Sequence, residues 1–107
     1  RLPPRLKVLT LGPEGALAFL GEGEVRVPGV RVRVVDTVGA GDTFTAGLLA
    51  LLLRRGGGRG VLEGLDLEGL REALEAAVAL SALAWTVRGA GLPEEGLAAW
   101  RARWLAG

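Results

Sequence analysis

The chain has 107 residues, half of them apolar, which is enough for one small domain or for a piece of a larger one. Its formal net charge of +1 gives no case for binding nucleic acid or a membrane surface through bulk electrostatics. Cysteine and histidine are absent, which excludes disulfides, zinc–thiolate sites and Ser-His-Asp catalysis in these residues and leaves proton transfer to carboxylates or to the single lysine, Lys7. No secretory signal and no bilayer-spanning apolar run is visible, so the sequence predicts a cytoplasmic protein.

Short apolar runs in the first quarter of the chain predict β-strands. Residues 6–11 (LKVLTL) are closed by the turn-forming residues 12–15 (GPEG), and we expect them to form a buried, parallel strand. Residues 16–20 and 24–27 are two further runs, and the Gly-Glu-Gly at 21–23 between them is typical of a hairpin.

A further strand is predicted over residues 30–36, where valine and arginine alternate. The period of two places the valines on one face, toward a core, and Arg31 and Arg33 on a solvated face. This strand leads directly into a glycine-rich segment.

Three helices are predicted in the rest of the chain. The first covers about residues 41–55 and is apolar on nearly every side, so we expect it to be buried. The second covers about residues 67–87 and has Asp66 as its N-cap. The third covers about residues 94–105 and starts at Pro93.

The order of a strand, a hairpin, a strand and then three helices predicts an α/β fold. The apolar helices have too little sheet to cover, so the chain resembles the C-terminal part of a larger α/β domain. Uncovered helix faces and sheet edges predict association, either as a homo-oligomer or with an N-terminal complementing chain.

Residues 36–49 (DTVGAGDTFTAGLL) are the most informative segment of the sequence. Gly39 and Gly41 allow a tight turn and the close approach of a ligand. The helix that follows directs its free N–H groups and its positive dipole end at that turn, an arrangement that attracts anions such as phosphate. Asp42 adds a carboxylate, a potential proton acceptor, at the same place. The local pattern also fits a plain strand-to-helix turn with an N-capping aspartate.

This segment closely resembles the C-terminal signature of the ribokinase-like (PfkB) carbohydrate kinases, and its DTVGAGDTF core is most like that of fructokinases. Residues 10–15 (TLGPEG) resemble the family's T-L-G-x-x-G nucleotide loop, and residues 86–90 (TVRGA) resemble its T-x-x-G-A segment. The three matches in order indicate that residues 1–107 are the C-terminal, ATP-binding and catalytic portion of a ribokinase-like α/β/α sandwich.

The resemblance implies a reaction in which ATP, with Mg²⁺, phosphorylates a small-molecule sugar. Asp42 matches the catalytic base that takes the proton from the attacking sugar hydroxyl. The backbone N–H groups of Gly39, Ala40, Gly41 and Asp42 match the anion hole for the transferring phosphoryl group. This assignment agrees with the physics of phosphoryl transfer, which needs positioning and charge neutralisation more than covalent help.

Further residues acquire roles through the same resemblance. Thr10, Gly12 and Gly15, together with Gly41, would lie along the ATP. Asp36 resembles the position that helps to bind a monovalent cation, usually K⁺, although a strand-end Asx turn explains an aspartate there equally well.

The sequence departs from the family pattern in two ways. Val78 stands where ribokinases often have a polar residue near the base, which leaves nucleotide preference open. The sugar-binding glycines, the lid strands and the magnesium-linked N-x-x-E motif of the N-terminal portion are absent from these residues. Two alternatives therefore remain, a catalytically silent nucleotide-binding or assembly fragment and a nucleoside kinase of the same family.

We expect Trp85, Trp100 and Trp104 to pack in the core or between helices and not to stack on a ligand.

Overall fold

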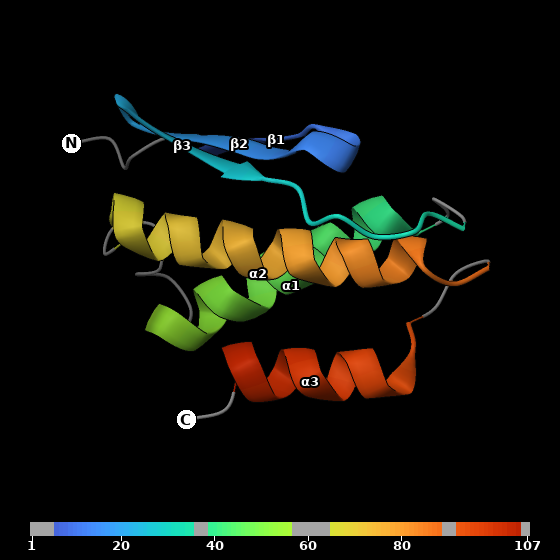
Figure 1. The fold of residues 1–107 in the computed structure, drawn as a ribbon. Helices are drawn as coiled ribbons and strands as arrows, with labels where there is room; N and C mark the ends of the chain where they lie inside the picture. The colour runs from blue at the N-terminus through green and yellow to red at the C-terminus, as the bar shows by residue number, and fades with distance from the viewer. Residues whose placement is uncertain (1–5, 36–38, 57–64, 89–91, 106–107) are drawn as a thin grey trace.

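The computed structural model describes residues 6–35, 39–56, 65–88 and 92–105. Three strands come first, and three α-helices follow (Figure 1). The elements are β1 (Leu6–Thr10), a 3₁₀ turn (Gly12–Glu14), β2 (Gly15–Leu20), β3 (Gly23–Pro28), α1 (Ala40–Gly56), α2 (Leu67–Trp85) and α3 (Glu94–Trp104). The α/β class expected from the sequence is confirmed.

The strands form one antiparallel sheet in the order β1-β2-β3. The predicted hairpin is confirmed, with Gly21 at a φ of 59° in its turn. The prediction for residues 6–11 was wrong in two respects, because β1 is antiparallel to β2 and Leu9 is 52% exposed. The cause is the 3₁₀ turn, which ends at Gly15 with a φ of 108° and returns the chain directly alongside β1.

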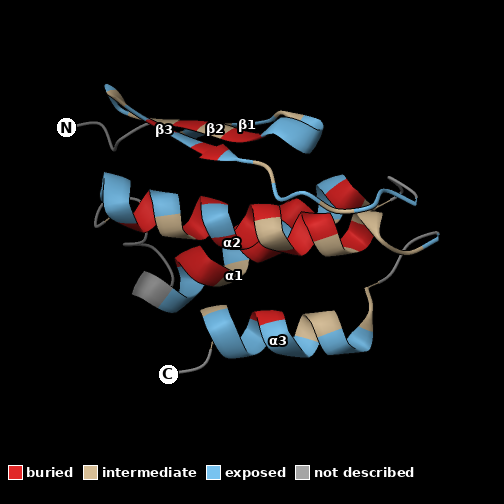
Figure 2. Ribbon diagram, in the orientation of Figure 1, coloured by how far each residue is buried: buried red, intermediate tan, exposed pale blue. Residues whose placement is uncertain are grey.

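Helix α2 lies at the centre of the molecule. It packs against β2 and β3 on one side and against α1 and α3 on the others (Figure 1). Buried residues gather on the sheet face that meets α2 and along α2 itself (Figure 2). The core is built from alanine, valine and leucine, with Leu51, Leu70 and Leu74 fully buried.

The predicted helix boundaries follow local capping signals. The carboxylate of Asp66 accepts a 2.7 Å hydrogen bond from the backbone N–H of Gly69, as an N-cap should. Pro93 directly precedes α3, which is anchored by Trp100, whose indole N–H donates to the carbonyl of Ala76 at 2.7 Å. Both helix starts are therefore confirmed.

Helix α1 is buried on one side only. Leu48, Leu51 and Leu52 face the core, whereas Leu49 and Leu53 are 51% and 56% exposed, so the expectation that α1 is buried on nearly every side was wrong for the described residues. None of the helices in the described ranges is long and apolar enough to span a bilayer.

The half-buried strand predicted over residues 30–36 does not form in the part that the structure describes. Val30, Val34 and Val35 are about half exposed, at 45%, 50% and 51%. A strand needs a partner along its length, and among the described residues the segment after Pro28 makes one backbone hydrogen bond, from Val35 to Trp85. The alternating valines match the sequence pattern of a strand, but in the described residues no neighbouring strand pairs with them.

Candidate functional site

The turn that enters α1 is fixed by Gly39 and Thr43. Gly39 has a φ of 80°, a left-handed conformation that favours glycine. Its carbonyl oxygen accepts both the backbone N–H of Thr43, at 2.9 Å, and the Thr43 hydroxyl, at 2.8 Å. The chain then enters α1 at Ala40, so the first backbone N–H groups of the helix have no partner within it and carry the positive end of the helix dipole.

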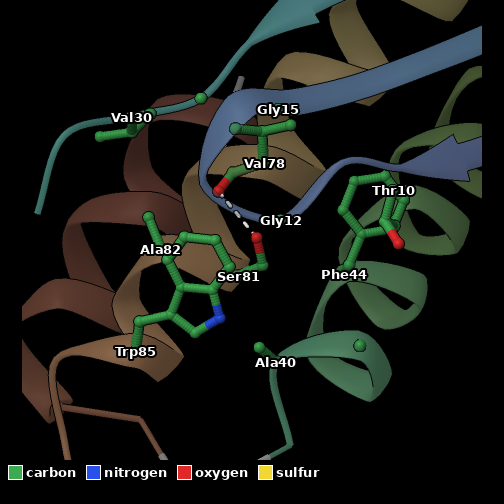
Figure 3. A pocket seen from close by; sticks show the side chains of 12 residues that line it. Thr10, Gly12, Gly15, Val30, Ala40, Phe44, Val78, Ser81, Ala82 and Trp85 are labelled. Carbon is green, nitrogen blue, oxygen red and sulfur yellow. Dashed lines mark hydrogen bonds between the residues drawn. The ribbon is translucent and has the colours of Figure 1, made fainter. Parts of the chain in front are cut away.

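A pocket lies beside this helix end (Figure 3). It is lined by Thr10, Gly12, Gly15, Gly29, Val30, Ala40, Gly41, Phe44, Val78, Ser81, Ala82 and Trp85. Its cavity volume of about 90 Å³ is below the ~300–1,000 Å³ of complete small-molecule sites. The described residues thus form part of the wall of a site rather than a closed one.

The pocket brings together residues from the predicted nucleotide loop and the predicted anion hole. Thr10, Gly12 and Gly15 line it from the end of β1 and the turn that follows, and Ala40 and Gly41 line it from α1. These two sequence segments meet because the end of β1 and the N-terminus of α1 both lie against the C-terminal half of α2, whose residues line the same pocket.

The other predicted site residues lie near or outside this pocket. Asp42 is exposed in the first turn of α1, next to Gly41, and is not part of the pocket lining. Gly39 precedes Ala40 and is half-buried. Asp36, the predicted cation ligand, lies outside the described residues, as do the last two residues of the TVRGA segment.

The glycines at the pocket differ in what requires them. A Cβ at Gly15 would lie 1.9 Å from the carbonyl oxygen of Val27, and one at Gly29 would lie 1.9 Å from that of Pro13, so the chain itself excludes side chains there. A Cβ at Gly41 meets nothing within 4 Å, and its φ is not in the left-handed region. Neither strain nor packing in the described structure requires glycine at position 41. The space that a Cβ would occupy there is open and leaves room for a ligand.

Val78 was expected to lie near the base, but three further lining residues of α2, Ser81, Ala82 and Trp85, were not expected from the sequence. Val78, Ser81, Ala82 and Trp85 follow one another at helical spacing on the face of α2 that lines the pocket. The Ser81 hydroxyl donates a 3.0 Å hydrogen bond to the carbonyl of Val78. This i, i+3, i+4, i+7 pattern was visible in the sequence, but it is also typical of plain core packing.

Trp85 departs from the packing role expected of it. Its ring lines the pocket, and its buried indole nitrogen has no acceptor among the described residues. Trp100 and Trp104 pack on the core as predicted.

No group of three or more acidic side chains that could hold a metal ion comes together in the described ranges.

Two solved structures share this architecture. Aminoimidazole riboside kinase from Salmonella enterica, crystallised with aminoimidazole riboside and an ATP analog, matches with a TM-score of 0.70 and 38% identity over 87% of this chain and 30% of that one. A double mutant of fructokinase from Vibrio cholerae O395, in a form with fructose, ADP and potassium ion bound, matches with a TM-score of 0.64 and 32% identity over 78% of this chain and 25% of that one. The fold is therefore that of the ribokinase-like sugar kinases.

The model of the pfkB family carbohydrate kinases matches residues 3–96. The chain belongs to this family. Probable fructokinase-6, chloroplastic, of Arabidopsis thaliana is 47% identical over 89 residues, which are 81% of this chain and 22% of the plant protein. The chain thus spans about a fifth of that relative and less than a third of either solved structure.

Proposed function

We propose that these residues are the nucleotide-binding and catalytic portion of an ATP-dependent kinase that phosphorylates a sugar hydroxyl. The observation that carries the proposal is the pocket at the N-terminus of α1, where residues 10–15 and the glycine-rich turn face the same space. Family membership supports the same reaction class, since the matched family consists of carbohydrate kinases.

The chemistry of the pocket fits a nucleotide. Phe44, Val78 and Ala82 offer an apolar wall for a flat base. The first turn of α1 offers free backbone N–H groups and a positive dipole end for phosphates. Gly41 lies at that end without a Cβ, which allows a phosphate oxygen to approach the backbone closely.

The proposed reaction divides between one side chain and the backbone. The sugar hydroxyl oxygen bonds to the γ-phosphorus of ATP, the bond from that phosphorus to the bridging oxygen breaks, and ADP leaves. Asp42 takes the hydroxyl proton, a role that its exposed position beside Gly41 permits. The backbone N–H groups of Gly39, Ala40, Gly41 and Asp42 neutralise the charge that develops on the transferring group.

Fructose is the substrate that we propose first. The DTVGAGDTF core is most like that of fructokinases, the plant relative is named a probable fructokinase, and the Vibrio cholerae enzyme was crystallised with fructose. A nucleoside is the second candidate, favoured by the match to aminoimidazole riboside kinase.

Residues 1–107 are, in this proposal, the C-terminal portion of a kinase domain whose N-terminal portion supplies the sugar site and the lid. The relatives extend well beyond the matched part, and the half-exposed valines at positions 30, 34 and 35 offer a surface for a neighbouring strand. Without that portion, the chain would bind nucleotide and remain catalytically silent, which is the alternative function. The cytoplasmic location of the protein remains a prediction from the sequence.

The ions of the reaction also belong to the proposal. Mg²⁺ would arrive with ATP and neutralise its phosphates. A K⁺ site at Asp36 is supported by the sequence resemblance and by the potassium ion in the Vibrio cholerae structure.

The Asp42→Asn variant of the kinase that contains these residues tests the assignment of the base. Asparagine has nearly the same shape and cannot accept the proton, so kcat for sugar-dependent ADP release should fall by about 10²-fold or more. The Kd for ATP should change little, because the backbone anion hole remains.

Asp66→Asn is the matched control, since it changes the same group at the start of another helix and asparagine caps a helix as well as aspartate. Its kcat should equal that of the wild type. An Asp42→Asn enzyme with unchanged kcat would refute the role of Asp42. If ADP release depends on a riboside and not on fructose, the nucleoside is the substrate and the proposal of fructose is wrong.

A further inference from the structure

One polar atom of the pocket wall lacks a partner. The indole nitrogen of Trp85 is buried and unbonded, and it is the one buried side-chain nitrogen or oxygen in the described residues of which this is true. Burying a hydrogen-bond donor without an acceptor is unfavourable, so such groups are rare in native proteins. Because Trp85 also lines the pocket, a bound ligand is a natural source of the missing acceptor.

The orientation of the ring identifies the part of the pocket concerned. Figure 3 shows the indole nitrogen turned toward the space between Ser81 and Ala40. Ala40 is the first residue of α1, and its neighbour Gly41 lines the same pocket. The nitrogen of Trp85 thus faces the end of the pocket where the free N–H groups of α1 lie.

Two kinds of donor meet at this end. An indole N–H donates and does not accept, and the same holds for the free backbone N–H groups of a helix N-terminus. The hydroxyl of Ser81, which also lines the pocket, donates its proton to the carbonyl of Val78 and makes no hydrogen bond with the indole nitrogen. A convergent set of donors favours an acceptor that carries negative charge.

We propose that the indole N–H of Trp85 donates a hydrogen bond to a phosphate oxygen of the bound nucleotide. Trp85 is then a nucleotide-binding residue that extends the backbone anion site of α1 from the end of α2. The inference rests on the proposed function, because it takes a nucleotide as the occupant of the pocket. Trp85, for which the sequence pattern indicated only a packing role, thereby becomes a ligand of the nucleotide's phosphates.

Trp85→Phe tests the inference, since phenylalanine keeps an aromatic ring in the pocket wall and removes the N–H. In the kinase that contains these residues, Kd for ADP and for adenosine is measured by calorimetry. We expect ADP to bind about tenfold more weakly and adenosine to bind as it does to the wild type, because a charge-assisted hydrogen bond is lost from the phosphates alone. Trp104→Phe, at a half-buried tryptophan that does not line the pocket, should leave both Kd values unchanged.

A second measurement does not depend on the folding of the variant. In the wild type, the ¹⁵N–¹H resonance of the Trp85 indole should shift on addition of ADP and stay in place on addition of adenosine. Equal weakening of ADP and adenosine would assign the N–H to the base and overturn the inference. Unchanged ADP binding by a folded Trp85→Phe protein would reduce Trp85 to a packing residue. A wild type that binds neither ligand would refute the proposed function itself.

Discussion

The backbone N–H of Val35 donates a 2.6 Å hydrogen bond to the carbonyl oxygen of Trp85. Trp85 is the last residue of α2, and Val35 directly precedes the glycine-rich segment that leads into α1. The bond therefore ties the entrance of one helix to the end of the other. The pocket lies at this junction, so its shape depends on how α1 and α2 pack as much as on the glycines themselves.

Gly41→Ala should separate ligand binding from folding. Nothing in the described structure lies within 4 Å of a Cβ at this position, and alanine is the better helix former. We expect the free energy of unfolding to stay the same or to rise by about 0.5–1 kcal/mol. The added methyl group occupies pocket space at the helix end, so ATP affinity and kcat should fall, as calorimetry and an ADP-release assay would show.

Gly15→Ala is the contrasting substitution on the opposite wall of the pocket. Its Cβ would lie 1.9 Å from the carbonyl oxygen of Val27, and the φ of 108° is itself unfavourable for alanine. The variant should lose at least about 2 kcal/mol of stability in denaturant titration. If Gly41→Ala were as destabilising as Gly15→Ala, the proposed ligand space at position 41 would be wrong.

Local signals explain why much of the fold was predictable. The carboxylate of Asp66 and the ring of Pro93 act on the residues next to them, so the helix starts follow from the sequence. The strand predicted over residues 30–36 depends instead on a partner, and the described part of the chain contains none for it. The antiparallel direction of β1 depends on the left-handed conformation of Gly15, which the sequence Gly-Pro-Glu-Gly permits without requiring.

The candidate site was predictable to a similar degree. Thr10, Gly12, Gly15, Ala40 and Gly41 were assigned to the nucleotide site or the anion hole, and the structure brings these five residues to one pocket, whereas Gly39 and Asp42 do not line it. The contribution of Trp85 was not predictable, because an apolar stripe on a helix predicts burial and gives no indication that one ring nitrogen lacks an acceptor.

Gly47 marks the close contact between α1 and α2. A Cβ there would lie 3.2 Å from both Cα of Ala77 and Cδ2 of Leu80. Gly47→Leu should force the helices apart and cost about 1–3 kcal/mol of stability. Because the pocket lies between these helices, nucleotide affinity should fall as well. Ala46→Leu, at the neighbouring exposed position, should leave both quantities nearly unchanged.

Trp100 fixes α3 to α2 through the hydrogen bond from its indole N–H to the carbonyl of Ala76. Trp100→Phe keeps most of the apolar contact and leaves that buried carbonyl without this donor, so we expect a loss of about 1–3 kcal/mol in the free energy of unfolding. Nucleotide affinity should not change, because neither residue lines the pocket.

Trp104→Phe provides the comparison on the same helix. Trp104 is half-buried beneath the guanidinium of Arg103, which lies 4.8 Å from the ring centroid, and phenylalanine keeps a ring in that position. Its stability should fall by less than about 1 kcal/mol, since an exposed cation–π contact contributes only ~0.5–1 kcal/mol. Equal losses in the two variants would show that α3 is held by apolar area alone. A larger loss at Trp100 assigns the difference to its hydrogen bond with Ala76.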